Sequence, residues 1–156
     1  MAHASQSFFD KAYNPVYQAL ASLAGVISII LLSKMANAIG LVEIPDRFPW
    51  LTAASFILLF SLFNSVFSLA TDNMVKYWGR SIYSFLGLAA GSGIVAYLFS
   101  HIPISEAGSY RWIYFVLFIG YLVFLSMMAT IRRIVEFAQK EEWNHPRIRR
   151  KNNKKN

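Results

Sequence analysis

Four long stretches of this chain carry no charged side chain, and this feature restricts its fold more than any other. They are residues 12–33, 51–71, 81–100 and 112–131, each about 20 residues long. A helix needs about 20 mostly apolar residues to cross a hydrocarbon core roughly 30 Å thick. The pattern therefore predicts four transmembrane helices.

The predicted spans, residues 15–37, 50–71, 81–101 and 110–131, take up more than half of the 156 residues. The connections between them are too short to form a soluble domain beside the bundle. A hydrophobic fraction of 56% also fits residence in a membrane. We therefore predict an all-α membrane protein in which residues 1–131 form a single four-helix transmembrane bundle.

The ends of the first and last spans show helix signals. Asn14 followed by Pro15 is typical of an N-cap and a first helical position. After the last span, Glu136 lies four residues from both Arg132 and Lys140, which favours a continuing helix. The sequence thus predicts a cytoplasmic amphipathic extension of the last span. It is followed by a basic C-terminal tail, disordered when free, and together they make up residues 132–156.

The positive charges are unevenly divided between the two sides of the predicted bundle. Four spans place both termini on the same side, and twelve of the fifteen Lys and Arg residues belong to that side. The other side has Lys34, Arg47 and Arg111. Cationic loops remain in the cytoplasm, so we expect a multi-pass protein with both termini cytoplasmic. Its membrane would be a bacterial inner membrane or an organelle membrane.

The second predicted span has two distinct faces. One is a row of aromatic residues spaced 4, 3 and 4 apart, namely Phe56, Phe60, Phe63 and Phe67. The other is polar and consists of Ser61, Asn64, Ser65 and Ser68. Polar groups in hydrocarbon need partners, so this face should point toward other helices. It could line a conduit or ligand groove, or simply form interhelical hydrogen bonds; the aromatic row is typical of packing or of a partner interface.

The third predicted span is rich in small residues. Gly87 and Gly91 form a GxxxG motif, and Gly93 belongs to a second small-residue row on another face. Small residues allow helix backbones to approach closely in a membrane. Two such faces predict that this span lies centrally in the bundle. They do not separate contacts within the bundle from contacts to another protein.

The residues needed for most site chemistry are missing from the predicted spans. The chain has no cysteine, and His3, His101 and His145 all lie at or outside the ends of the spans. Haem ligation, zinc or di-iron binding and serine nucleophiles all require partners that this pattern does not supply. We therefore expect no cofactor, no metal site and no enzymatic activity, and the sequence has no specific nucleic-acid motif.

Three functions are compatible with these features. The first is a small accessory, assembly or structural subunit that packs against other membrane protein subunits. The second is an oligomeric transporter or channel for lipid or a small neutral solute, using the Ser/Asn face of the second span. The third is a membrane-permeabilising protein of the kind that phages use, which is also short, multi-spanning and basic at one end.

The basic C-terminal region suggests a further partner. Its cations include Arg132, Arg133, Arg147, Arg149, Arg150, Lys151, Lys154 and Lys155. Each Lys or Arg near an anionic leaflet contributes about 1 kcal/mol of attraction. We therefore expect this region to contact membrane lipids, in particular anionic lipid, or an acidic surface, unless it serves only to set the topology.

Overall fold

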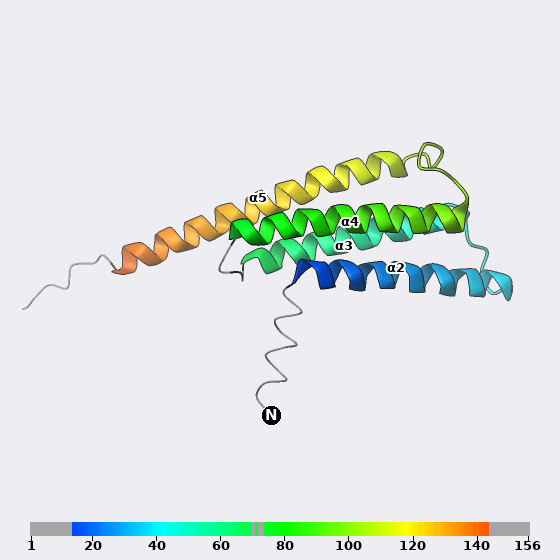
Figure 1. The fold of residues 1–156 in the computed structure, drawn as a ribbon, viewed down its shortest axis with the longest axis horizontal. Coiled ribbons are helices and arrows are strands. Elements are labelled where there is room, and N and C mark those ends of the chain that lie inside the picture. The colour runs from blue at the N-terminus through cyan, green and yellow to red at the C-terminus, as the bar shows by residue number, and fades with distance from the viewer. Residues whose placement is uncertain (1–13, 70, 72–73, 144–156) are drawn as a thin grey trace, which may run out of the picture.

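The computed structural model describes residues 14–69, 71 and 74–143, and this part of the chain forms four helices (Figure 1). They are α2 (Pro15–Ala38), α3 (Phe48–Leu69), α4 (Met74–Ser100) and α5 (Tyr110–Trp143). All four are long and apolar enough to cross a membrane. For the described residues, the prediction of an all-helical fold with four helices suited to crossing a membrane is confirmed.

Both ends of α2 follow from local chemistry. The Asn14 side chain accepts a hydrogen bond of 3.2 Å from the backbone N–H of Val16, so the predicted N-cap is confirmed. At the other end, Gly40 has a φ of +76°, which a residue with a Cβ rarely adopts. The N–H of Leu41 then donates to the carbonyl of Ala36, which completes a Schellman C-cap.

Helix α3, and not the glycine-rich α4, is the central helix of the bundle. It packs closely against all three other helices, whereas α4 packs closely on α2 and α3 and reaches α5 through the ring of Phe85. Half of the most apolar window of α3 is buried, compared with 28% for α4. The small residues of α4 correctly predict neighbours on two sides, α2 and α3, but the most central helix is α3, whose polar face needs protein around it.

One predicted boundary differs clearly from the structure. Helix α4 begins at Met74, seven residues before the predicted start, so Lys76 and Arg80 belong to the helix and not to a connection. Long cationic side chains near a helix end can reach the headgroup region, so they do not have to end the helix. Helix α5 continues without a break to Trp143, in agreement with the predicted helical extension, and extends beyond the ends of the other helices (Figure 1).

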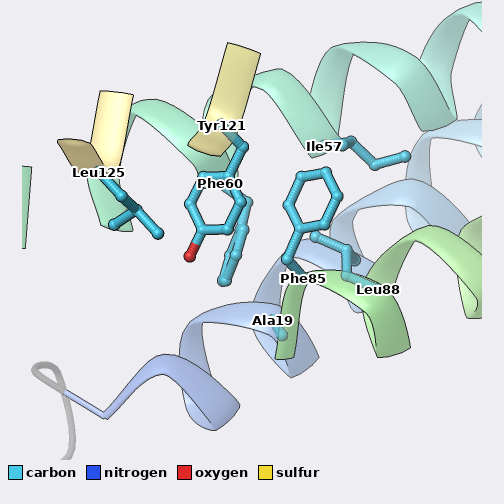
Figure 2. Close-up of a cluster of buried hydrophobic side chains, with 7 residues drawn as sticks. All are labelled: Ala19, Ile57, Phe60, Phe85, Leu88, Tyr121 and Leu125. Atoms are coloured by element: carbon cyan, nitrogen blue, oxygen red, sulfur yellow. The ribbon is translucent and has the colours of Figure 1, made fainter. Parts of the chain in front are cut away.

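A cluster of aromatic and aliphatic side chains joins the four helices in the half of the bundle where α2 and α4 begin. Its buried members are Ala19, Ile57, Phe60, Phe85, Leu88, Tyr121 and Leu125 (Figure 2). The rings of Phe85 and Tyr121 are stacked with centroids 4.6 Å apart, and Phe60 lies within 6.4 Å of both. Such aromatic pairs add stability beyond the area that they bury.

A second cluster closes the opposite end of the bundle around Trp50. Its indole N–H donates a 3.1 Å hydrogen bond to the carbonyl of Ile102, in the connection between α4 and α5. The Trp50 ring also meets the edge of Tyr114, with centroids 5.7 Å apart. A Cβ added to Gly93 would lie 3.9 Å from this ring, so Gly93 lets α4 approach Trp50 closely.

Candidate functional site

The side chain of Asn64 is bonded to all three other helices. Its amide N–H groups donate to Gln18 of α2 at 3.1 Å and to the hydroxyl of Tyr77 of α4 at 3.2 Å. Its carbonyl oxygen accepts from Ser81 of α4, and from the hydroxyl of Tyr121 of α5 at 2.9 Å. An amide has two donors and two acceptor positions, so this Asn64 network uses its full capacity.

The network is shielded from the surroundings of the bundle. Asn64, Ser81 and Tyr121 have no exposed surface, and Tyr77 is also buried. The Tyr77 hydroxyl itself donates to the backbone carbonyl of Asn64 at 3.4 Å. Burial of a polar group costs free energy unless the group is hydrogen-bonded. Here the four bonds of the Asn64 amide connect α3 to α2, α4 and α5. The network therefore works as a four-helix junction.

The three serines of the polar face behave differently from Asn64. They are also buried, but their hydroxyls donate to carbonyls of α3 itself: Ser61 to Ile57 at 2.8 Å, Ser65 to Ser61 at 2.6 Å and Ser68 to Ser65 at 2.6 Å. Serine in a membrane helix satisfies itself in this way without a neighbour. Among the described residues, the side-chain hydrogen bonds from this polar face to other helices all involve Asn64.

The partners of Asn64 were missed by sequence analysis. Gln18, Tyr77, Ser81 and Tyr121 look unremarkable along the chain, and the tyrosines resemble residues of an interfacial belt. An asparagine within a membrane span does indicate that four hydrogen-bond positions of its side chain need partners. Polar side chains in the other spans, at a depth similar to that of Asn64, are the signal that could have identified these partners.

The aromatic row of α3 is divided among three environments. Phe60 is buried in the core cluster, Phe56 and Phe67 are partly buried, and Phe63 is 55% exposed. The row therefore does not form one continuous interface. Phe56 lies against Gly25 of α2, where an added Cβ would approach the ring carbon Cζ to 2.9 Å. Gly25 is thus a close helix contact that its isolated position in the sequence did not reveal.

The glycines of α4 do not share a single contact surface either. A Cβ on Gly91 would lie 3.4 Å from the side chain of Leu23 on α2, and Gly93 faces Trp50 of α3. Gly87, the first residue of the GxxxG motif, has open space at its Cβ position. Two of the three predicted packing glycines therefore face other helices, and the third borders a groove.

Helix α5 presents a long apolar face that no other described element covers. Its exposed members recur every three or four residues, which places them along one side of the helix: Val116, Ile119, Val123, Met127, Ile131 and Ile134. We call this row the α5 stripe. A shallow depression of about 510 Å³ runs along it between Ile119 and Ile131.

Arg132 fixes the position of α5 where the stripe leaves the bundle. Its guanidinium donates to the backbone carbonyl of Thr71, just after α3, and its Nε forms a 2.9 Å ion pair with Glu136. The pairing expected between Arg132 and Glu136 is confirmed. Arg133 is exposed. The predicted tail residues Arg147, Arg149, Arg150, Lys151, Lys154 and Lys155 lie outside the described residues.

The described residues contain no group of three or more His, Cys, Asp or Glu side chains that could hold a metal ion. The chain matches no protein-family model, and no curated protein or solved structure is significantly similar to it. Two features of the described residues remain as the main candidates for function: the closed Asn64 network inside the bundle and the uncovered α5 stripe on its surface.

Proposed function

We propose that this chain is a non-enzymatic accessory or assembly subunit that docks onto a larger membrane complex through α5. The observation that carries the proposal is the α5 stripe. Only 11% of the apolar window of this helix is buried, the lowest share of the four candidate spans. An extended apolar row at helical spacing is suited to packing against a helix of another protein.

The end of the stripe adds to this argument. Lipid tails can cover apolar side chains at membrane depth, but the stripe continues past the two arginines that mark the predicted membrane boundary. Ile134 is 61% exposed and Phe137 is 65% exposed in this continuation. Exposed apolar side chains outside hydrocarbon usually mark an interaction surface. A partner that follows α5 out of the membrane would cover both parts.

The alternative, an oligomeric transporter or channel using the Ser/Asn face, has less support. That face is buried within one chain, and the side chain of Asn64 forms its hydrogen bonds with residues inside the bundle. A solute path along it would require the four helices to separate. The closed network therefore favours a scaffolding role for the polar residues.

Purification of the tagged chain from its native membrane in mild detergent tests the subunit proposal. We expect stoichiometric partners of other sequence, lost when Val123→Trp and Ile119→Trp are placed on the stripe. Ile94→Trp is the matched control, because Ile94 is an apolar residue on α4 that is at least as exposed as Ile119 and Val123. A clean homo-oligomer from the wild type would contradict the proposal, and so would partners that survive both stripe variants.

We also propose that both termini and the extension of α5 are cytoplasmic, and that the basic tail contacts anionic lipid or an acidic surface. Support comes from the charge division along the sequence. Truncation after Trp143 should weaken binding to phosphatidylglycerol liposomes at low salt, with little difference at high salt because added ions screen the attraction. Unchanged binding at low salt would refute the lipid contact.

A further inference from the structure

A groove opens on the surface of the bundle between the first halves of α2 and α4. These two helices run in the same direction, so both N-termini lie at the same end (Figure 1). The groove has a volume of about 420 Å³, and most of its walls are apolar, with Leu20 and Leu23 on one side and Leu88 on the other. It lies within two candidate membrane spans and opens to their surroundings. Hydrocarbon is therefore what fills it in a bilayer.

Gly87 keeps the groove open. It lines the groove, and a Cβ at this position would meet no atom within 4 Å. The glycine is therefore not required for close helix packing, and its missing side chain leaves space for a guest. From Arg80 to Leu88 the groove follows α4 for eight residues, or about 12 Å at 1.5 Å per residue. This length suits part of an extended acyl chain.

One end of the groove is polar. Arg80 lines it there, and in the described part of the chain this guanidinium has no ion pair or hydrogen bond. Ser84, one turn further along α4, also lines the groove; it is 8% exposed, and its hydroxyl has no hydrogen-bond partner among the residues that the structure describes. An unbonded hydroxyl at membrane depth is costly. A ligand with oxygen acceptors next to its acyl chain would supply the missing partner.

The depth of Arg80 matches a lipid headgroup. The candidate span of α4 begins at Lys76 and has 25 residues, or about 38 Å, which exceeds the hydrocarbon thickness of roughly 30 Å. Arg80 lies only about 6 Å along the helix from Lys76, within reach of the interface by snorkelling.

We propose that this groove is a binding site for one anionic glycerophospholipid. An acyl chain lies between α2 and α4, the phosphate pairs with the Arg80 guanidinium, and the Ser84 hydroxyl donates to an oxygen at the glycerol. Arginine suits a phosphate because its planar fork can form two parallel hydrogen bonds. The described groove residues include no carboxylate that could receive an amine headgroup, so an anionic lipid fits better than a zwitterionic one.

Lipid retention by the purified full-length chain tests the proposal. Delipidated protein in detergent is mixed with equal amounts of phosphatidylglycerol and phosphatidylcholine of identical acyl chains, and bound lipid is counted by native mass spectrometry. We expect one retained lipid, with phosphatidylglycerol preferred about fivefold, the factor expected for one cationic side chain. Arg80→Gln should remove this preference, and Gly87→Leu should remove retention of both lipids by filling the groove.

Two control variants separate the groove from a general surface effect. Lys76→Gln removes a cation at the same end of α4 but outside the groove, and Gly79→Leu adds the same side chain at another glycine with open space around it. Both should bind lipid as the wild type does. The proposal is overturned if the wild type shows no preference, or if Lys76→Gln reduces the preference as much as Arg80→Gln. It is also overturned if Gly87→Leu folds with unchanged melting temperature and still retains the lipid.

Discussion

At the scale of single residues, Asn64 differs from every serine around it. A buried serine of α3 satisfies its hydroxyl on its own helix, and its neighbours lose nothing when it is removed. The side-chain amide of Asn64 does not bond to its own helix and is hydrogen-bonded to Gln18, Ser81 and the two tyrosines, Tyr77 and Tyr121, instead. Asn64 and the buried serines are therefore equally buried but should contribute differently to the stability of the bundle.

Substitution of Asn64 tests this difference. Asn64→Leu removes four interhelical side-chain bonds, each worth about 0.6 kcal/mol in membrane proteins, so we expect a loss of about 2 kcal/mol. Ser61→Ala is the matched control, one turn away and equally buried, and should cost less than about 0.5 kcal/mol. Unfolding by SDS titration in mixed micelles measures both. Equal stabilities of the two variants would show that the junction is not a stabilising element.

The contact of Gly25 with the Phe56 ring gives a second prediction at this scale. Gly25→Ala places a methyl group against the ring and should cost about 1–3 kcal/mol by overpacking. Gly120→Ala, at a helical glycine with open space, should be close to neutral. Adding Phe56→Leu should restore stability to Gly25→Ala, because the colliding ring atoms are gone. No rescue in the double mutant would mean that the helices do not touch there.

At the scale of elements, α5 is held at two separated points. Tyr121 joins it to Asn64 within the bundle, and Arg132 joins it to the carbonyl of Thr71 at the end of α3. Between these points the helix packs along α3, and Phe85 of α4 stacks on the Tyr121 ring. Arg132 is the polar contact that holds α5 close to the point where it extends past the other helices.

Arg132→Gln should loosen the C-terminal part of α5 without unfolding the bundle. Because the chain has no cysteine, Leu20→Cys on α2 and Phe137→Cys on α5 can be spin-labelled as a unique pair. We expect a broader distance distribution between these labels in Arg132→Gln. Arg133→Gln, which removes an exposed neighbouring cation, should leave the distribution unchanged. Identical broadening in both variants would attribute the effect to lost charge and not to the bond with Thr71.

The elements themselves were largely predictable, and their arrangement was not. Hydropathy located the four candidate spans because a chain in hydrocarbon must satisfy its backbone hydrogen bonds internally, which leaves few structures other than helices. The N-cap at Asn14 was predictable because it is a local signal. The predicted start of α4 was seven residues too late because the charges of Lys76 and Arg80 interrupt the apolar pattern although the helix continues through them. The central position of α3 and the partners of Asn64 depend on which helices meet, and that is set by packing between residues distant in sequence.

At the scale of the whole molecule, the two ends of the bundle are built differently. The end near Trp50 is closed by the bond to Ile102 and by the covering side chain of Ala107, which has no exposed surface. The opposite end holds the Asn64 network, the bond from Arg132 to Thr71 and the proposed lipid groove. The proposed lipid groove and the exposed end of the α5 stripe thus lie at the end with the excess of cations.

The orientation of the chain in its membrane decides which compartment meets that end. The charge division predicts that the Trp50 end faces away from the cytoplasm. Asn37→Cys and Lys140→Cys are exposed single-cysteine variants at opposite ends of an otherwise cysteine-free chain. In intact cells or right-side-out vesicles, a membrane-impermeant maleimide should label Asn37→Cys at once and Lys140→Cys only after permeabilisation. The reverse order would place the α5 extension outside the cytoplasm, and any partner of the extension would then have to be sought there.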